Sequence, residues 1–327
     1  MASSIQMETL TFLSADGTSQ VFARLWMPEP ETAVRGAIQL VHGMEEHGGR
    51  YEAFADFLAH LGYLVGIHDH VGHGHTAPDR ERLGHIPFRG GSKILVEDTH
   101  AMHDILRTRL TSLDQAQEPV RGSEKPLILF GHSMGSFVVR SYLGLYATGV
   151  SAAIICGTGQ QPGALLSFGK LMTALLARFH GEHTQLRLLD TLVTGGFSRA
   201  IKSARTPLDW LSVDPAVVDA YRADPCCGHR FSVGGYRTLI NLSAEAQSKR
   251  RAAKISKDLP LLFIAGSEDP VGDAGVGVGR AAAMYRSAGL TDIEVILYEG
   301  YRHEILNEPC RKRVMQDIAS WLSAHDL

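Results

Sequence analysis

The sequence has few cysteines and no excess of positive charge, and each absence argues against a class of protein. Four cysteines occur in 327 residues and none forms a CxxC pair, so neither a disulfide scaffold nor a zinc site of paired cysteines is expected. The net charge of −3 lacks the basic excess of a nucleic-acid-binding protein. We therefore expect reduced thiols, a reducing compartment and no nucleic-acid partner.

The sequence also lacks an apolar run long enough to cross a membrane. The most apolar window covers residues 164–179 and contains Lys170 and Arg178, whereas a membrane-spanning helix needs about 20 apolar residues. The N-terminal residues show neither the basic start nor the apolar stretch of a signal peptide. The expected location is cytoplasmic, including a peripheral position at a membrane.

What the sequence does contain is an alternation of short apolar runs with helical patterns. The apolar runs predict strands at 10–13, 21–26, 37–41, 63–67, 127–130, 152–156, 261–265 and 293–297. The helical patterns outside the middle of the chain lie at 51–61, 95–110, 135–146, 275–288 and 309–324. This alternation predicts the α/β class, with a mostly parallel sheet covered by helices on both faces.

The alternation is interrupted once, in the middle of the chain. Residues 158–247 contain no strand-like run of comparable strength. They contain helical segments at 164–179, 207–222 and 235–247, separated by glycines and Asp-Pro pairs. We interpret this stretch as a helical cap inserted into a core that consists of residues 1–157 and 248–327.

The strongest chemical signal is Gly131-His132-Ser133-Met134-Gly135, which follows a predicted strand and precedes a predicted helix. This is the G-x-S-x-G spacing of a nucleophile elbow, whose sharp turn exposes the serine hydroxyl at the carboxyl edge of the sheet. The two glycines remove Cβ atoms that such a turn would bring into contact. The pattern is common by chance, but its place between strand and helix makes Ser133 the predicted nucleophile.

A serine hydroxyl is a weak nucleophile unless a histidine takes its proton and a carboxylate orients that histidine. In this fold the acid and then the base follow the serine along the chain. His303 follows the last predicted strand by a short loop, whereas His325 lies at the end of the sequence. Glu268 and Asp269 both follow strand 261–265; we prefer Asp269 and interpret Glu268 as a solvated loop carboxylate.

Ester hydrolysis passes through an oxyanion that needs two N–H donors. The residue after the nucleophile, Met134, provides one. The second is expected from the loop after strand 37–41, which begins His42-Gly43-Met44, and Met44 is the predicted donor. His42 itself is interpreted as a brace for this loop.

A second group of histidines follows strand 63–67. The group consists of His68, His70, His73 and His75, together with Asp69. It has the composition of a metal site, but the glycines between its members indicate a tight loop, and we interpret the side chains as braces. The sequence therefore predicts neither a metal nor a cofactor.

Five sequence motifs resemble the monoacylglycerol lipase and lysophospholipase group of α/β-hydrolases, and the likeness extends over essentially the whole chain. The motifs are His42 to Tyr51, Asp69 to Gly74, Gly131 to Gly135, Asp269 to Gly272 and Arg302 to Glu304. The resemblance implies the α/β-hydrolase fold, the same triad and oxyanion donors, and a cap whose apolar face admits an acyl chain. It also places Glu46 and Arg50 where the group's lipases meet the glycerol head group. The sequence differs at Leu306, where the animal lipases carry a further histidine.

The leading hypothesis is a serine hydrolase that cleaves a single-chain lipid ester, a monoacylglycerol or a lysophospholipid, through an acyl-enzyme. Helix 164–179 is apolar around most of its circumference, so Leu171 and Leu175 are predicted to line an acyl tunnel and the cap to contact membrane surfaces transiently. A broad carboxylesterase and a peptide hydrolase are the alternatives. The latter needs cap carboxylates for a free ammonium group, with Glu182, Asp190 and Asp209 as candidates. A non-catalytic binding protein is disfavoured because all three triad residues are present.

Overall fold

Eight strands form one sheet in the order β1-β2-β4-β3-β5-β6-β7-β8 in the computed structural model, which describes residues 5–116, 124–146 and 148–327. Strand β2 is antiparallel to β1 and β4, and all other neighbouring strands are parallel. The strands are β1 (Gln6–Leu13), β2 (Gln20–Met27), β3 (Gly36–Val41), β4 (Tyr63–His68), β5 (Leu127–His132), β6 (Ala152–Cys156), β7 (Leu261–Gly266) and β8 (Ile293–Tyr298). The predicted α/β class is confirmed. Residues 1–4, part of the stretch in which no signal peptide is expected, lie outside the described residues.

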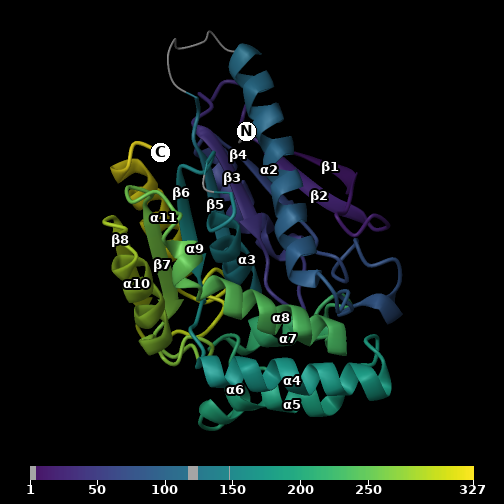
Figure 1. Cartoon of the computed structure of the whole chain (residues 1–327). Coiled ribbons are helices and arrows are strands. Elements are labelled where there is room, and N and C mark those ends of the chain that lie inside the picture. Colours follow the sequence, from purple (N-terminus) through teal and green to yellow (C-terminus); the bar gives the residue numbers. More distant parts are fainter. Residues whose placement is uncertain (1–4, 117–123, 147) are drawn as a thin grey trace.

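The two faces of the sheet carry separate hydrophobic layers, because successive side chains of a strand point to opposite faces. In β5, Leu127 and Leu129 pack in one layer, and Ile128 and Phe130 pack in the other. Figure 1 labels four helices that cover the sheet: α2 (Gly91–Ala116), α3 (Met134–Leu143), α10 (Val276–Ser287) and α11 (Arg311–Ala324). A further helix, α1 (Glu52–His60), packs against β4. Helices α2, α3 and α10 contribute to the first layer, and α1 and α11 to the second. Two short 3₁₀ helices, η1 (Gly48–Tyr51) and η2 (Arg80–Arg82), lie in the loops.

All the regular secondary structure described between β6 and β7 consists of helices. Its helices are α4 (Gly163–His180), α5 (Arg187–Val193), α6 (Gly195–Ala200), α7 (Pro215–Ala223), α8 (Val233–Ala246) and α9 (Lys249–Ala252). Figure 1 shows α4, α5 and α6 together at one end of the molecule, with α8 between them and α3 of the core. We call residues 158–247 the cap segment; that it is a separate domain stays a prediction.

The cap segment differs from the sequence-based expectation at one helix. The predicted helix 207–222 begins only at Pro215, because proline is favoured at the first helical position and Asp214 caps the helix by accepting a hydrogen bond from the main-chain N–H of Ala216. The residues before it form turns that carry Trp210 and Leu211. Helices α5 and α6, which span seven and six residues, were not predicted.

No helix in the described part of the chain combines the length and the apolar character that crossing a membrane requires. All four cysteines are free, and Cys156 and Cys310 are buried.

Candidate active site

Ser133 occupies a strained turn between β5 and α3. Its backbone has φ 52° and ψ −118°, a region that non-glycine residues rarely adopt and that marks functional sites when the surroundings enforce it. The turn is tight enough to require its glycines. A Cβ atom on Gly131 would lie 2.5 Å from the carbonyl oxygen of Gly135, and one on Gly135 would lie 2.1 Å from that of Val41. The elbow geometry therefore follows from the motif's glycines.

The loops after β7 and β8 bring Asp269 and His303 together. His303 Nδ1 lies 2.8 Å from Asp269 Oδ2, and both residues are buried. The other oxygen of Asp269 accepts a hydrogen bond from the main-chain N–H of Val271. Asp269 is thus held in place by its own loop and in turn orients the His303 ring. Glu268 is exposed, as expected for a solvated carboxylate.

His303 Nε2 is buried and has no hydrogen-bond partner among the described residues. It belongs to the lining of a small cavity that Ser133, Gly43 and Met44 also line. No hydrogen bond joins the Ser133 hydroxyl to His303 among the described contacts. Such contacts are often long in unliganded hydrolases and tighten when substrate binds.

The two predicted oxyanion donors, the main-chain N–H groups of Met44 and Met134, are both unpaired among the described residues. Met134 is the first residue of α3, so its N–H is one of the donors that a helix leaves unpaired. Met44 follows Gly43, whose N–H is fixed 2.6 Å from Glu46 Oε1. The positive end of the helix dipole adds to the stabilisation of an anion at this position.

Glu46 is buried and hydrogen-bonded on both oxygens. Its Oε1 accepts from the N–H of Gly43, from Tyr51 Oη at 2.8 Å and from His132 Nδ1 at 3.2 Å. Its Oε2 accepts from Arg50 Nη1 at 2.9 Å. Burial favours the neutral acid, but the His132 hydrogen bond and the neighbouring positive charges hold the pKa of Glu46 well below its usual value. In this conformation Glu46 orders the loop that carries Met44.

Arg50 is engaged in the same network. It donates from both terminal nitrogens to the carboxylate of Glu304, the residue after His303, and its guanidinium lies over the Tyr221 ring. Arg50 does not line the cavity at Ser133, whereas Glu46 does. The head-group role implied for these two residues by the resemblance stays a prediction.

His132, the second residue of the elbow motif, connects this network to His303. Its Nδ1 faces Glu46, its Nε2 lies 3.3 Å from the carbonyl oxygen of His303, and the two imidazole rings are 4.7 Å apart. Burial lowers the pKa of His132, but Glu46 outweighs it, so that the net shift is upward. A protonated ring donates to both partners, which matches the two acceptors that surround it.

Two histidines near β4, His42 and His70, hold loops together, whereas neither ring nitrogen of His68 has a hydrogen-bond partner among the described residues. His42 donates from Nδ1 to the carbonyl oxygen of Gly43 and accepts at Nε2 from the N–H of His70. Asp69 accepts from the N–H groups of Gly48 and His75. Burial lowers the pKa of His42 and of His70 well below the usual value, so both rings are neutral. These contacts are those of loop braces.

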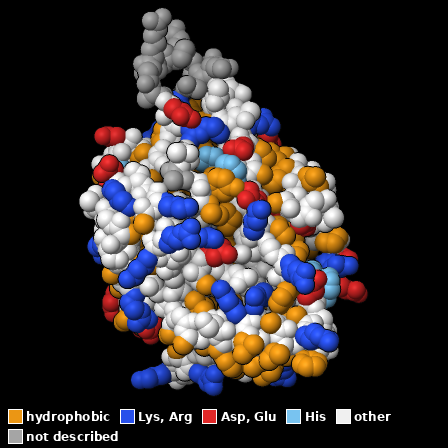
Figure 2. Space-filling model, viewed as in Figure 1, with side chains coloured by type: hydrophobic (Ala, Val, Ile, Leu, Met, Phe, Trp, Pro, Cys, Tyr) orange, Lys and Arg blue, Asp and Glu red, His pale blue; other side chains and the backbone are white. Residues whose placement is uncertain are grey.

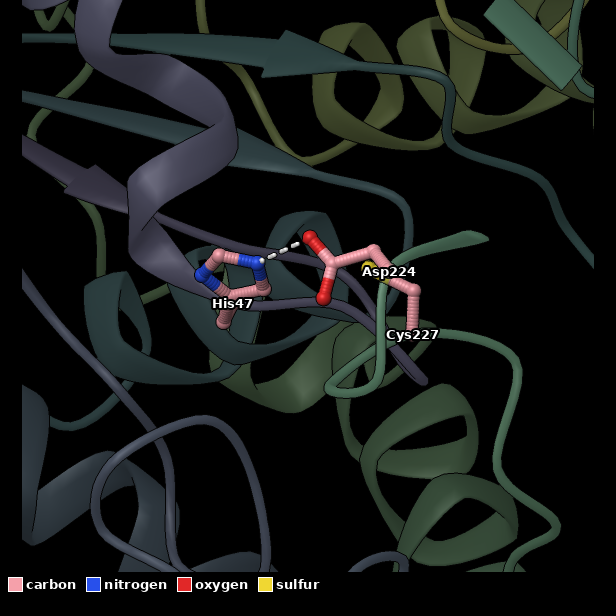
Figure 3. Close-up of side chains that lie close together, drawn as sticks. All are labelled: His47, Asp224 and Cys227. Carbon is pink, nitrogen blue, oxygen red and sulfur yellow. Dashed lines mark hydrogen bonds and ion pairs between the residues drawn. The ribbon is translucent and has the colours of Figure 1, made fainter. Parts of the chain in front are cut away.

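One group in the described part of the chain has the spacing of metal ligands. The ligand atoms of His47, Asp224 and Cys227 lie within 4.8 Å of one another (Figure 3). His47 Nδ1 accepts from the N–H of Gly49, so Nε2 carries the proton and donates to Asp224 Oδ2 at 3.0 Å. Both ring nitrogens are thus already used, and burial raises the pKa of the Cys227 thiol. The hydrogen bond between His47 and Asp224 connects the loop after β3 to the segment after α7.

The cavity beside Ser133 is closed by the cap segment. Its volume is about 20 Å³, room for about one water molecule. Trp210 and Leu211 form part of its lining. The Trp210 ring packs 5.1 Å from the His303 ring, and the main-chain N–H groups of His303 and Glu304 donate to the carbonyl oxygens of Trp210 and Leu211. A substrate larger than a water molecule therefore reaches Ser133 only when this part of the cap segment moves.

A much larger groove lies on the other side of Trp210. It has a volume of about 1010 Å³ and is lined by residues that include Leu165, Phe197, Ile201 and Val271. The Phe197 and Trp210 rings are 5.0 Å apart, and Val271 belongs to the same hydrophobic cluster as Trp210. Trp210 thus lines the catalytic cavity and packs against residues of the groove, whose lining also includes charged side chains such as Lys202 and Arg302.

The residues predicted to line an acyl tunnel lie elsewhere in this conformation. Leu171 and Leu175 are 60% and 48% exposed on α4, and neither lines the cavity or the groove. The structure does not bring them to Ser133. The three cap carboxylates do not converge there either. Glu182 accepts from the N–H of Phe88, Asp190 from Thr194, and Asp209 from Thr206, and none lines the cavity.

Sequence reasoning missed three residues at the site. His132 was treated only as the variable position of the elbow, Trp210 was assigned to a helix, and Glu45 was given no role. A signal existed for His132, because the residue before an elbow serine must lie at the sheet edge. No comparable signal marks Trp210 or Glu45.

The sheet order, the elbow serine and the buried Asp269–His303 pair define a serine hydrolase with the α/β-hydrolase fold. A family model described as "Serine aminopeptidase, S33" matches residues 32–310, and the chain belongs to this family. The monoacylglycerol lipase of Mycolicibacterium smegmatis is 30% identical over 90% of this chain and 91% of its own length. The human monoglyceride lipase is 28% identical over 95% of this chain and 89% of its own length.

Solved structures of an esterase and a lipase resemble this chain over nearly its whole length. A thermostable carboxyl esterase from Bacillus coagulans, solved in complex with glycerol, has a TM-score of 0.85 and 28% identity, and the match covers 98% of this chain and 99% of that one. A soluble variant of the Saccharomyces cerevisiae monoglyceride lipase, with a substrate analog, has a TM-score of 0.72 at 21% identity over 99% and 96% of the two chains, a likeness of fold. The chain is a serine hydrolase of the lipase and carboxylesterase kind.

Proposed function

We propose that the chain hydrolyses single-chain lipid esters, with Ser133 as nucleophile, His303 as general base and Asp269 as the residue that orients the base. The observation that carries this proposal is the buried 2.8 Å contact between His303 Nδ1 and Asp269, with the unpaired Nε2 on the cavity that Ser133 also lines. A carboxylate on Nδ1 fixes the tautomer whose Nε2 accepts a proton.

In the proposed reaction, Ser133 Oγ attacks the ester carbonyl carbon and its proton passes to His303 Nε2. The carbonyl oxygen becomes an oxyanion and accepts hydrogen bonds from the N–H groups of Met44 and Met134. When the intermediate collapses, the alcohol leaves with the proton from His303 and the acyl group stays on Ser133. Water then repeats the sequence, releasing the fatty acid and regenerating the serine.

An acyl chain needs an apolar path that the closed cavity lacks. The groove that Phe197 and Val271 help to line supports a route past Trp210, because Phe197 packs against the Trp210 ring and Val271 belongs to the same hydrophobic cluster. The charged residues Lys202, Glu268 and Arg302 also line this groove, so apolar side chains form only part of the route. Each methylene buried there contributes about 0.8 kcal/mol. Monoacylglycerol and lysophospholipid share this acyl part, and the named relatives favour monoacylglycerol as the first substrate to test.

We also propose transient contact of the cap segment with lipid surfaces. Large apolar side chains are exposed along α4 and α5: Leu165, Phe168, Leu171, Leu175, Phe179, Leu188 and Leu192. Figure 2 shows hydrophobic side chains gathered at the end of the molecule where these helices lie. Exposed apolar patches of this kind mark interaction surfaces, and this one would place the groove entrance near its substrate. It gives Leu171 and Leu175 a role outside the catalytic cavity.

The first experiment tests the nucleophile. Ser133→Ala should reduce esterase activity by at least about 10³-fold while the fold is retained, and a fluorophosphonate probe should label the unmodified protein at Ser133 alone. The second measures kcat/KM for p-nitrophenyl esters of two to sixteen acyl carbons, with aminoacyl anilides beside them. We expect medium and long chains to exceed acetate. A maximum at acetate would replace the lipid ester by a broad carboxylesterase substrate, and higher activity on the anilides would favour the peptide hydrolase.

A further inference from the structure

The lining of the cavity beside Ser133 includes a glutamate that the proposed reaction does not use. Glu45 lines this cavity, is 9% exposed, and its Oε1 is buried without a hydrogen-bond partner among the described residues. Two other buried atoms of the lining share this condition, His303 Nε2 and Trp210 Nε1. Because buried polar atoms are nearly always paired, an unpaired one beside a nucleophile indicates a group that a ligand completes.

The backbone of Glu45 is held in a conformation that it would not adopt freely. Its φ is 57°, in the left-handed region. Its carbonyl oxygen accepts from Tyr221 Oη at 2.7 Å and from the N–H of Gly228 at 3.0 Å. Both donors come from the cap segment, so the cap fixes the position of Glu45 relative to Met44, its neighbour in the oxyanion loop. The strain is enforced by the surroundings, as at functional sites.

The adjacent glutamate cannot serve in the same way. Glu46 already accepts four hydrogen bonds from the protein, including those from Gly43 and Arg50. A substrate hydroxyl that bound Glu46 would have to share these acceptors, whereas Glu45 Oε1 is free. His303 Nε2 meets the oxygen of the departing alcohol. A further hydroxyl on that alcohol needs a partner in the same cavity, and Glu45, a lining residue, has an oxygen without a partner among the described residues.

Burial and the nearby charge of Asp190 raise the pKa of Glu45 to about 8. The groups that face it come from three helices and one loop: Asp190 on α5, Tyr221 on α7, Tyr236 on α8, and Arg230 in the loop before α8. Arg230, whose Nε lies 3.6 Å from Asp190 Oδ2, lowers the pKa of Glu45 by less than burial and Asp190 raise it. At neutral pH Glu45 is mostly the uncharged acid, which both donates and accepts a hydrogen bond.

We propose that Glu45 is a specificity-determining residue that recognises a second hydroxyl on the leaving alcohol, so that esters of polyols such as glycerol are preferred over esters of simple alcohols. This inference rests on the proposed ester hydrolysis at Ser133 but not on the length of the acyl chain. The uncharged acid suits this place for a second reason: a carboxylate next to Met44 would repel the oxyanion that forms there.

The test compares 1-monobutyrin with ethyl butyrate, two short esters that differ in the hydroxyls of the alcohol. At pH 7 we expect the unmodified enzyme to favour monobutyrin in kcat/KM. Glu45→Gly should lower the ratio of kcat/KM for monobutyrin to kcat/KM for ethyl butyrate by roughly tenfold, because it removes one hydrogen bond to the substrate. Glu45→Gln, which keeps a donor and an acceptor, should hold the ratio within about threefold. Glycine suits φ 57°, so misfolding is not expected to cause the loss.

A matched variant controls for the relaxed backbone. Ser203→Gly likewise introduces glycine at a positive φ of 59°, but at an exposed residue of the cap segment. It should leave the ratio unchanged. A pH series from 7 to 9 adds a second measurement. Activity of the unmodified enzyme on both esters should fall as Glu45 ionises near pH 8, and Glu45→Gln should not show this fall.

The outcomes separate this proposal from the proposed function. If Glu45→Gly lowers both esters equally, or leaves the ratio unchanged, Glu45 does not recognise the alcohol. Identical pH profiles for the unmodified enzyme and Glu45→Gln would contradict the uncharged donor. If Glu45→Gln loses as much as Glu45→Gly while aminoacyl substrates gain above pH 8, the carboxylate binds an ammonium group instead. Full activity of Ser133→Ala would overturn both proposals, whereas a preference for acetate in the chain-length series would leave the monobutyrin test valid.

Discussion

The guanidinium of Arg50 donates two hydrogen bonds of 2.6 Å to the carboxylate of Glu304, the residue that directly follows His303. One end of this pair belongs to η1 and the other to the loop after β8. The pair therefore connects the loop that carries Met44 to the loop that carries the proposed base. Breaking one side of a buried ion pair leaves an uncompensated charge.

Replacing Arg50 should consequently affect stability and catalysis together. We expect Arg50→Met to lower the free energy of unfolding by about 3 kcal/mol and to reduce kcat on monoacylglycerol and on an ethyl ester by similar factors, with KM little changed. Urea denaturation and steady-state kinetics measure these quantities. Arg205→Met, at an exposed pair with Asp219, is the control and should change neither. A rise in KM confined to monoacylglycerol would instead show that Arg50 contacts the glycerol head group.

The elbow should not tolerate a methyl group at Gly135. A Cβ there would lie 2.1 Å from the main-chain oxygen of Val41, and backbone cannot move aside as a flexible side chain does. We expect Gly135→Ala to lower the free energy of unfolding by about 3 kcal/mol and to abolish labelling of Ser133 by a fluorophosphonate.

Gly279→Ala provides the comparison for this variant. Gly279 lies within α10 with no atom within 4 Å of an added Cβ, so alanine should stabilise the helix by roughly 0.5 to 1 kcal/mol. Thermal unfolding of both variants tests the assignment, and equal effects at the two glycines would mean that the elbow is looser than the geometry indicates.

Trp210 should control access of long acyl chains. Removing its ring should open the cavity at Ser133 toward the groove that Phe197 and Val271 line. Trp210→Ala should then raise the ratio of kcat/KM for decanoate over acetate, by about tenfold if opening normally costs about 1.4 kcal/mol. The void should also reduce the free energy of unfolding by about 3 kcal/mol. Trp321, a similarly buried tryptophan of α11, is the matched control: Trp321→Ala should lose stability without altering the ratio. An unchanged ratio in Trp210→Ala would show that the chain enters by another path.

The pH dependence of stability should report on His132. Its folded-state pKa is raised, mainly because Glu46 outweighs burial, so its stabilising contribution is complete below the unfolded value of about 6.5 and is lost as the pH rises through the folded-state value. We expect the difference in unfolding free energy between the unmodified protein and His132→Asn to be larger at pH 6 than at pH 9. Urea titrations at the two pH values measure it, and a difference that does not vary with pH would mean that the ring is uncharged.

Much of this molecule could be predicted because its chemistry restricts the sequence strongly. A buried parallel strand needs a short apolar run, and the elbow needs Gly131 and Gly135, so the sheet and Ser133 were both predictable. Asp269 and His303 were predictable because the fold fixes their order along the chain. The cap segment was harder. Its helices are short, and whether 207–214 forms a helix or turns depends on the packing of Trp210 against His303, a contact that links residues 93 positions apart.

For a similar reason, the sequence could not predict which of two adjacent glutamates hydrogen-bonds within the loop. Glu45 and Glu46 have the same chemistry, and only the backbone at Glu45, with its positive φ, decides which carboxylate turns inward to Gly43 and Tyr51. That conformation depends in turn on Tyr221, which is distant in sequence. Local patterns cannot report such a choice.

The place where the cap segment joins the sheet has a consequence for how this enzyme can diverge. The segment leaves at the end of β6 and returns at the start of β7, and these two strands are hydrogen-bonded neighbours. Insertions and deletions in it can therefore leave the strand pairing of the sheet intact, provided that the turns around Trp210 and Leu211, which contact the His303 loop, are kept. Selection on substrate range can then act mainly on this one stretch of the chain, while the proposed triad of Ser133, Asp269 and His303 stays the same.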